Sequence, residues 1–240
     1  MGYASLFCLI VAAQFVPAAA RADQNEKVQV DAIKEKYWNR GDESELGVVQ
    51  NRLYTKAGKL EVGSFFGMLS SDPFLSVQSF GGSVGFHLSE YLGLRLLGWK
   101  SQVSPSNALI TFQETRGATT NTNEPRAFYG AEAAGSILYG KLSFLGKKII
   151  YYDLHLLGGA GVTQTESGNY ITPLLGVGQQ IYLSKSLSLV VDYRLMAYRE
   201  NLLEKVIPTK LGQVVDERMN WTNTLTLGIS MLFGGGGDES

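Results

Sequence analysis

Apolar residues recur at every second position along most of the chain after residue 59, which is the period of a β-strand with two different faces. In the last such segment only Asn223 and Leu232 break the division between apolar residues and Asn, Thr, Gly and Ser. Between Val77 and Phe80 the parity changes, which predicts a bulge or a bend. The pattern predicts eight strands, over residues 59–69, 74–88, 91–101, 128–144, 149–164, 170–183, 187–199 and 219–233.

The connections between these segments alternate in length. Residues 89–90, 145–148 and 184–186 are tight turns, whereas the intervening connections include the long polar stretches 102–127 and 203–217. An even number of strands with short turns on one side and longer loops on the other is typical of outer-membrane β-barrels. In such a barrel the short turns and both termini lie in the periplasm.

The same alternation also occurs in soluble barrels, which turn their apolar face inward, so other features must decide. Aromatic residues lie toward strand ends on the apolar face, as at a membrane interface: Tyr129, Tyr139, Tyr152, Trp221 and Phe233. Glycines gather on the polar face, which suits a narrow interior that must make room for a few large polar side chains. They are Gly63, Gly67, Gly85, Gly93, Gly130, Gly140, Gly159, Gly161, Gly176, Gly178 and Gly228. We therefore expect the apolar face to meet lipid.

The ends of the chain differ from the strand region. Residues 1–22 resemble a secretory signal peptide, because Leu6–Val16 has the length of its apolar core and Ala20 and Ala22 form the small-residue cleavage pattern. The one cysteine, Cys8, lies in this leader, so no disulfide framework is expected. The charged segment 23–56 is expected to be a periplasmic N-terminal segment, and 234–240 a flexible glycine-rich tail. The barrel itself is predicted over 57–233.

Composition excludes several other classes of protein. Aromatic residues make up 11% of the chain, which argues against disorder, and 21 basic against 22 acidic residues leave no excess charge for binding nucleic acid. The two histidines and the leader cysteine give no metal-ligand spacing. The glycine runs at 158–161 and 234–237 lack the helix and Lys-Ser/Thr of a phosphate loop, so we expect no cofactor.

The C-terminal strand NTLTLGISMLF resembles the signal by which the barrel-assembly machinery recognises outer-membrane proteins. Its expected assembly signal is Leu227, Ile229, Met231 and Phe233. The eight-strand plan resembles the membrane domain of outer membrane protein A and the small X-type barrels. The pieces NRLYTKAGKLEVGSFFG, DPF and GFHLSEYLGL resemble the outer-membrane β-barrel domain family of myxobacteria and Bdellovibrio-like bacteria, over roughly residues 48–233. That resemblance implies an outer-membrane location and no enzymatic activity.

Charged residues with inward parity are the candidate functional residues of such a barrel. They are Glu61, Arg95, Glu132, Asp153, His155, Asp192 and Arg194. Buried charges must pair or change their protonation, so we interpret this set as a polar network that fills the lumen, with a narrow channel as the alternative.

A rival hypothesis is a lipid A-modifying enzyme, because Phe86-His87-Leu88-Ser89-Glu90 contains the His-x-Ser letters of barrel deacylases. This piece lies at an expected periplasmic turn, on the wrong side for chemistry on lipid A in the outer leaflet. The sequence therefore predicts a non-enzymatic, all-β, eight-stranded antiparallel outer-membrane barrel of a Gram-negative envelope. Its role is structural or surface interaction, its expected partners are outer-membrane lipid, lipopolysaccharide and the assembly machinery, and the ligand of its loops is not identified.

Overall fold

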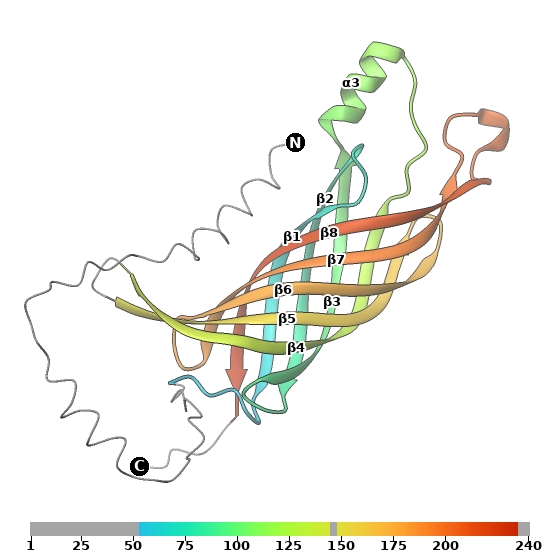
Figure 1. Ribbon diagram of the computed structural model, residues 1–240. Helices are drawn as coiled ribbons and strands as arrows, with labels where there is room; N and C mark the ends of the chain where they lie inside the picture. The colour runs from blue at the N-terminus through green and yellow to red at the C-terminus, as the bar shows by residue number, and fades with distance from the viewer. Residues whose placement is uncertain (1–52, 145–147, 235–240) are drawn as a thin grey trace, which may run out of the picture. The chain divides into compact units, whose positions relative to one another are not determined.

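The computed structural model describes residues 53–144 and 148–234. The expected signal peptide, nearly all of segment 23–56 and the tail beyond Gly234 lie outside the described residues. Eight antiparallel strands pair in sequence order, and β1 also pairs with β8, so the sheet closes into a barrel (Figure 1). The strands are β1 (Leu60–Ser70), β2 (Leu75–His87), β3 (Leu92–Pro105), β4 (Pro125–Phe144), β5 (Lys148–Thr165), β6 (Asn169–Tyr182), β7 (Leu187–Leu203) and β8 (Val214–Phe233). The predicted fold is confirmed.

The two ends of the barrel differ. At one end, here the turn end, β1 begins, β8 ends and the connections run through residues 88–91, 145–147 and 183–186. At the other end, the loop end, the connections are 71–74, 106–124, 166–168 and 204–213, and the last includes the short helix η1 (Pro208–Lys210). Strands β7 and β8 continue beyond the β1 pairing, which stops at Ser70 and Asn223. Their hairpin therefore projects at the loop end (Figure 1).

The expected loop 102–127 is largely structured. β3 continues to Pro105, β4 starts at Pro125, and a helix, α3 (Asn107–Arg116), lies between them. The Ser106 hydroxyl caps this helix by accepting the N–H of Leu109 at 3.3 Å, and Gly117 ends it in the left-handed conformation at φ 63°. Leu109 is its one buried residue, so the helix has no apolar stripe from which the pattern could have predicted it.

None of the helices in the described part of the chain is long and apolar enough to cross a membrane.

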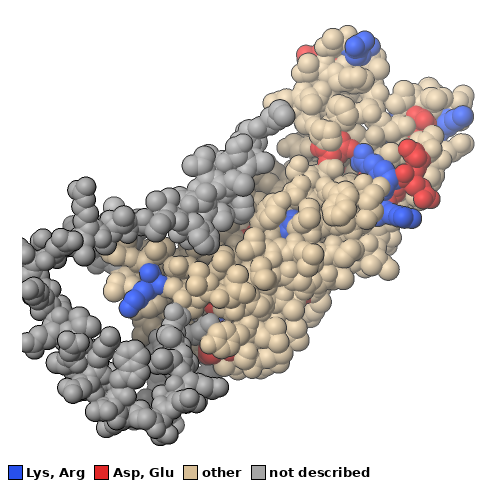
Figure 2. Space-filling view, viewed as in Figure 1, with Lys and Arg blue, Asp and Glu red and all other residues tan. Residues whose placement is uncertain are grey.

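The barrel wall is apolar outside and polar inside. In β8 the apolar residues of the alternating pattern are 39–59% exposed, whereas Thr222, Thr224 and Thr226 are at most 3% exposed. These apolar residues are Met219, Trp221, Leu225, Leu227, Ile229, Met231 and Phe233. The other strands repeat this arrangement, and few charged side chains show across the middle of the face in Figure 2. A soluble barrel would bury its apolar face, so this distribution is that of a transmembrane β-barrel.

Two of the sequence-based placements, of Tyr139 and Gly140, are wrong because β4 contains a β-bulge. The pairing with β5 passes from Ser136–His155 to Leu138–Leu154, which leaves Ile137 as the extra residue. Beyond it the parity is reversed, so Tyr139 is 8% exposed inside the barrel and does not belong to an interface girdle. Gly140 lies on the outer face beneath the ring of Tyr152, not in the lumen.

The predicted bulge in β2 is absent. Its pairing with β1 and β3 runs without a register shift across Val77 and Phe80. The parity of the pattern changes because Leu75 and Val77 are apolar residues that face the lumen, at 8% and 3% exposure. The interior of the barrel is therefore not polar throughout.

Candidate functional site

Four of the predicted lumen residues form one ionic cluster, here the arginine cluster: Arg95, Glu132, Asp192 and Arg194. Arg95 of β3 stands directly opposite Glu132 of β4, and Asp192 and Arg194 share one face of β7. The Arg194 guanidinium binds both oxygens of Glu132 at 2.9 Å and Asp192 at 2.8 Å. Arg95 Nε lies 3.0 Å from Glu132 and its Nη1 lies 3.4 Å from Asp192. All four side chains are buried.

Two histidines pair with carboxylates of the lumen. His155 Nε2 lies 3.1 Å from Asp192 Oδ1, as expected for a member of the predicted network. Glu61, the sixth predicted residue, lies 2.6 Å from His87 Nε2. The sequence-based lumen set left out His87, although its inward parity placed it there.

Asp153, the seventh predicted residue, belongs to a separate cluster nearer the turn end. It accepts a hydrogen bond from the Ser136 hydroxyl at 2.6 Å, and its carboxylate lies 3.1 Å from Lys56 Nζ. Lys56 precedes β1 and is 4% exposed. No periodic pattern covers Lys56, so its entry into the lumen could not be predicted from the alternation.

Aromatic residues close the turn end beyond these charges. The ring of Tyr54 stacks on that of Tyr182, with centroids 4.9 Å apart, and meets the edge of Tyr151 at 5.2 Å. Its backbone N–H points to the Tyr139 hydroxyl at 3.4 Å. Leu232, one of the two exceptions in the β8 pattern, is buried with Tyr139 and Tyr182. The segment just before β1 therefore helps to fill this mouth.

An apolar layer lies on the loop side of the arginine cluster. Trp99 and Phe128 stack with ring centroids 4.4 Å apart. Along β3, Trp99 is four residues beyond Arg95 toward the loop end. The layer consists of Leu69, Leu75, Val77, Leu97, Trp99, Phe128, Leu174 and Met196. The sequence interpretation of a polar lumen did not include it.

A further polar cluster lies at the loop end, beyond the apolar layer. Its centre is Glu200, which is 1% exposed. Its carboxylate accepts hydrogen bonds from Arg218 at 2.6 Å, Asn123 at 2.7 Å and Asn220 at 2.8 Å. Arg218 also binds Asp72 of the β1–β2 connection at 2.8 Å. These contacts tie two loop-end connections, β1–β2 and β3–β4, to the barrel wall.

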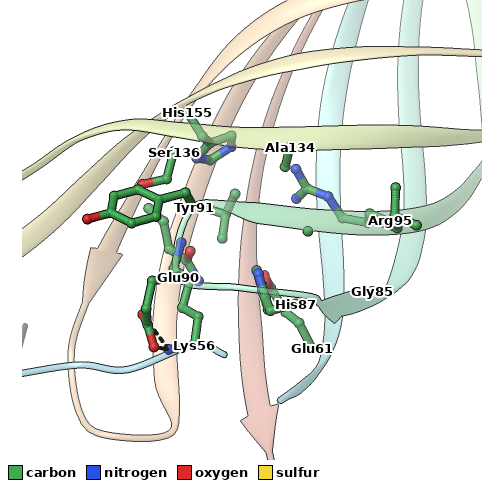
Figure 3. A pocket seen from close by; sticks show the side chains of 14 residues that line it. Lys56, Glu61, Gly85, His87, Glu90, Tyr91, Arg95, Ala134, Ser136 and His155 are labelled. Atoms are coloured by element: carbon green, nitrogen blue, oxygen red, sulfur yellow. Dashed lines mark hydrogen bonds and ion pairs between the residues drawn. The ribbon is translucent and has the colours of Figure 1, made fainter. Parts of the chain in front are cut away.

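Little space remains between these layers. A cavity of about 20 Å³ lies at the turn end among Lys56, Glu61, His87, Arg95, Ser136 and His155 (Figure 3). A second cavity beside Asp192 and Arg194 is about 10 Å³. A cavity needs roughly 10–15 Å³ to hold one water molecule. Each of these two cavities therefore has room for about one water molecule rather than for an organic substrate.

The letters of the deacylase motif do not form a catalytic pair. His87 points to Glu61, whereas the Ser89 hydroxyl accepts the N–H groups of Tyr91 and Leu92 within its own turn. Among the described residues no group of His, Cys, Asp and Glu is arranged to hold a metal ion. The chemistry of the site is thus charge pairing, because each predicted lumen carboxylate lies within 3.1 Å of a cation or an imidazole. These carboxylates are Glu61, Glu132, Asp153 and Asp192.

The expected assembly residues, Leu227, Ile229, Met231 and Phe233, are 50–54% exposed on the outer face.

No protein-family model matches the chain, and no curated protein matches it. Among solved structures, the chain is similar to outer membrane protein OprG from Pseudomonas aeruginosa, with 11% identity, 76% of this chain and 99% of that chain covered, and a TM-score of 0.41. It is also similar to the N-terminal barrel domain of Pseudomonas aeruginosa OprF, with 12% identity, coverage of 74% and 98%, and a TM-score of 0.39. It is similar as well to Neisserial surface protein A, with 12% identity, 73% of this chain and 96% of that chain covered, and a TM-score of 0.37. These are likenesses of fold alone.

Proposed function

We propose that this chain is an integral outer-membrane β-barrel with a closed lumen, whose role is structural or consists in presenting its loops at the cell surface. The observation that carries the proposal is the filling of the lumen at every level of the wall. Along β7 alone, Asp192 and Arg194 lie in the arginine cluster, Met196 in the apolar layer and Glu200 in the loop-end cluster. An eight-stranded barrel is just wide enough for side chains to fill.

The proposed orientation places the turn end in the periplasm and the loop end, with α3 and the β7–β8 hairpin, outside the cell. Short turns face the periplasm in barrels of this kind. Biogenesis would then use the barrel-assembly machinery, with Phe233 at the periplasmic interface, and a cleaved leader for export. The narrower likeness to the myxobacterial and Bdellovibrio-like family remains a prediction from the short motifs quoted above.

Ion conductance tests the closed lumen. Purified full-length barrel in planar lipid bilayers is expected to give no stepwise current above that of protein-free membranes. The variant Trp99→Ala/Phe128→Ala removes the stacked rings of the apolar layer and serves as a comparison for a loosened lumen. Stepwise currents from the unaltered protein would instead support the narrow channel, for which the two water-sized cavities are the favouring observation.

Surface labelling tests location and orientation. The one native cysteine lies in the expected leader, so single cysteines can be introduced as Glu114→Cys in α3 and Lys185→Cys in the β6–β7 turn, both exposed positions. A membrane-impermeant maleimide added to intact cells should label the first and spare the second. The reverse pattern, or labelling of neither, would contradict the proposal.

A further inference from the structure

One row of residues across three strands of the outer face carries two long polar side chains. Lys100 of β3, Ala127 of β4 and Gln164 of β5 are successive Cα partners. Lys100 is exposed and Gln164 partly so, whereas the small Ala127 between them is 6% exposed. Two long polar side chains thus flank one small residue in one row of strand partners, which runs obliquely around the wall because the strands of a barrel are tilted.

A second bulge in β4 adds a guanidinium to this row. The β4–β5 pairing passes from Pro125–Thr165 to Ala127–Gln164, so Arg126 and Ala127 together oppose Gln164. Pro125 and Phe128 are buried, whereas Arg126 is exposed. A bulge re-aims the side chain of the extra residue. The exposed Arg126 directly precedes Ala127, which is the strand partner of Lys100.

On β4 and β5 this row lies one step toward the loop end from exposed apolar residues, whereas on β2 it continues to Phe80, which is 68% exposed. The next outward row toward the turn end is Gly98, Tyr129 and Val162, in which Tyr129 is 50% and Val162 39% exposed. The Tyr129 ring lies across Gly98, where a Cβ would meet it at 2.9 Å. Rows two residues apart are about 7 Å apart along a strand, so the cations lie one step beyond an interfacial aromatic.

The positive charge of this row is not balanced by the protein. Neither Lys100 nor Arg126 makes an ion pair within the described ranges 53–144 and 148–234. The neighbouring carboxylates of Glu124 and Glu166 are directed to Lys205, with N–O distances of 3.8 and 2.6 Å. The two cations of this row therefore have no anionic partner among the described residues.

We infer that Lys100, Arg126 and Gln164 bind a phosphate group of a lipid A-type glycolipid in the leaflet on the loop side, an inference that rests on the proposed outer-membrane location. Arginine holds phosphate through two parallel N–H donors, lysine adds a point charge, and the glutamine amide donates a further hydrogen bond. Phosphates in that leaflet lie at the level just beyond the acyl chains, and the two cations lie one step beyond the interfacial Tyr129.

The test uses the purified full-length barrel in detergent micelles, titrated with diphosphoryl lipid A and read by native mass spectrometry. The variant Lys100→Gln/Arg126→Gln should bind about tenfold or more weakly, since each surface cation near an anionic headgroup contributes several-fold. The control Arg116→Gln/Lys210→Gln removes the same charge from exposed positions of α3 and η1. It should bind like the unaltered protein. A change of gel mobility on boiling verifies that each variant is folded.

Three further probes identify the ligand. Dephosphorylated lipid A and inorganic phosphate should each bind far more weakly than diphosphoryl lipid A. Equal binding of dephosphorylated lipid A, or equal loss in both double variants, would overturn the phosphate site. Equal binding of phosphatidylglycerol would overturn the assignment to lipid A. Because binding in micelles does not depend on orientation in the cell, its failure is distinct from failure of the surface labelling.

Discussion

The side chains of Arg194 and Glu132 join opposite walls of the barrel through two parallel hydrogen bonds, each 2.9 Å long. The two residues are 62 positions apart in the chain and lie on β7 and β4. Such a bidentate pair fixes direction as well as distance. The attraction within a buried ion pair roughly balances the free energy that is needed to remove both charges from water. The larger effect on stability therefore comes from removing one partner, which leaves the other charge buried without it.

Arg194→Met should therefore lower the free energy of unfolding by about 3–5 kcal/mol, because Glu132 and Asp192 keep buried charges with fewer partners. Urea unfolding in lipid vesicles measures the change. Arg199→Met, at an exposed position of the same strand, is the matched control and should change stability by about 0.5 kcal/mol or less. Equal effects of the two variants would show that the cluster does not stabilise the lumen.

Gly178→Ala should disrupt the pairing of His155 with Asp192. An added Cβ would overlap both Asp192 Oδ1 and His155 Nε2. Overpacking of this kind costs about 1–3 kcal/mol. Gly158→Ala is the control, because its nearest atom would be Leu175 Cδ2 at 3.7 Å. The same unfolding assay compares them, and a neutral Gly178→Ala would mean that the histidine contact is loose.

The carboxylate of Glu204 orders the start of the β7–β8 loop. Its Oε1 accepts the backbone N–H of Val206 at 2.8 Å and of Ile207 at 3.1 Å, and these bonds hold its pKa below the ordinary 4.5. A lowered pKa means that this stabilisation is present above the unfolded-state value and is lost as the pH falls through the folded-state value. Hydrogen exchange of the two amides, corrected for its intrinsic pH dependence, should therefore accelerate in acid.

Glu204→Ala supplies the comparison for that measurement. Its Val206 and Ile207 amides should exchange rapidly at neutral pH and lose the acid-induced acceleration. Glu217→Ala, at an exposed position of β8, should behave like the unaltered protein. Protection that is unchanged by Glu204→Ala would assign the order of the loop to other contacts.

Phe233→Ser should lower the yield of folded protein in the outer-membrane fraction, because it removes the exposed aromatic that ends β8. Deletion of residues 234–240 should leave insertion intact, because that segment has no apolar periodicity. Quantitative immunoblotting of membrane and periplasmic fractions measures both. The opposite pair of results would place the end of the assembly signal in the tail.

The alternating pattern predicted all eight strands because, within the membrane, one face meets lipid and the other the lumen. It ended β7 at residue 199 and began β8 at 219, whereas the strands continue to Leu203 and start at Val214. Beyond the membrane both faces of this hairpin meet water, so hydropathy no longer alternates. Beyond Ile137 the predicted inner and outer faces of β4 are interchanged. A bulge shifts the alternation by one residue, and nothing in the composition of the strand indicates it.

Inward parity selected seven charged lumen residues, and all seven are buried, but the set did not include His87 or Glu200. The pattern missed Lys56, which reaches Asp153 from outside any strand. The interpretation of a polar lumen also left out the apolar residues Trp99 and Phe128. Apolar residues on the inner face look like errors in the alternation when only the sequence is available. They fill the barrel because a narrow lumen, once closed to water, accepts apolar and paired polar side chains alike.

The most direct test of a barrel wall that faces lipid is the free energy of unfolding of Leu227→Arg compared with Met219→Arg. Both residues lie on the outer face of β8, at 54% and 50% exposure, but Leu227 pairs with β1 whereas Met219 lies beyond the end of that pairing. In lipid vesicles the first should cost about 2–4 kcal/mol and the second about 0–1 kcal/mol. Equal small costs, with the unaltered protein soluble in detergent-free buffer, would contradict the account.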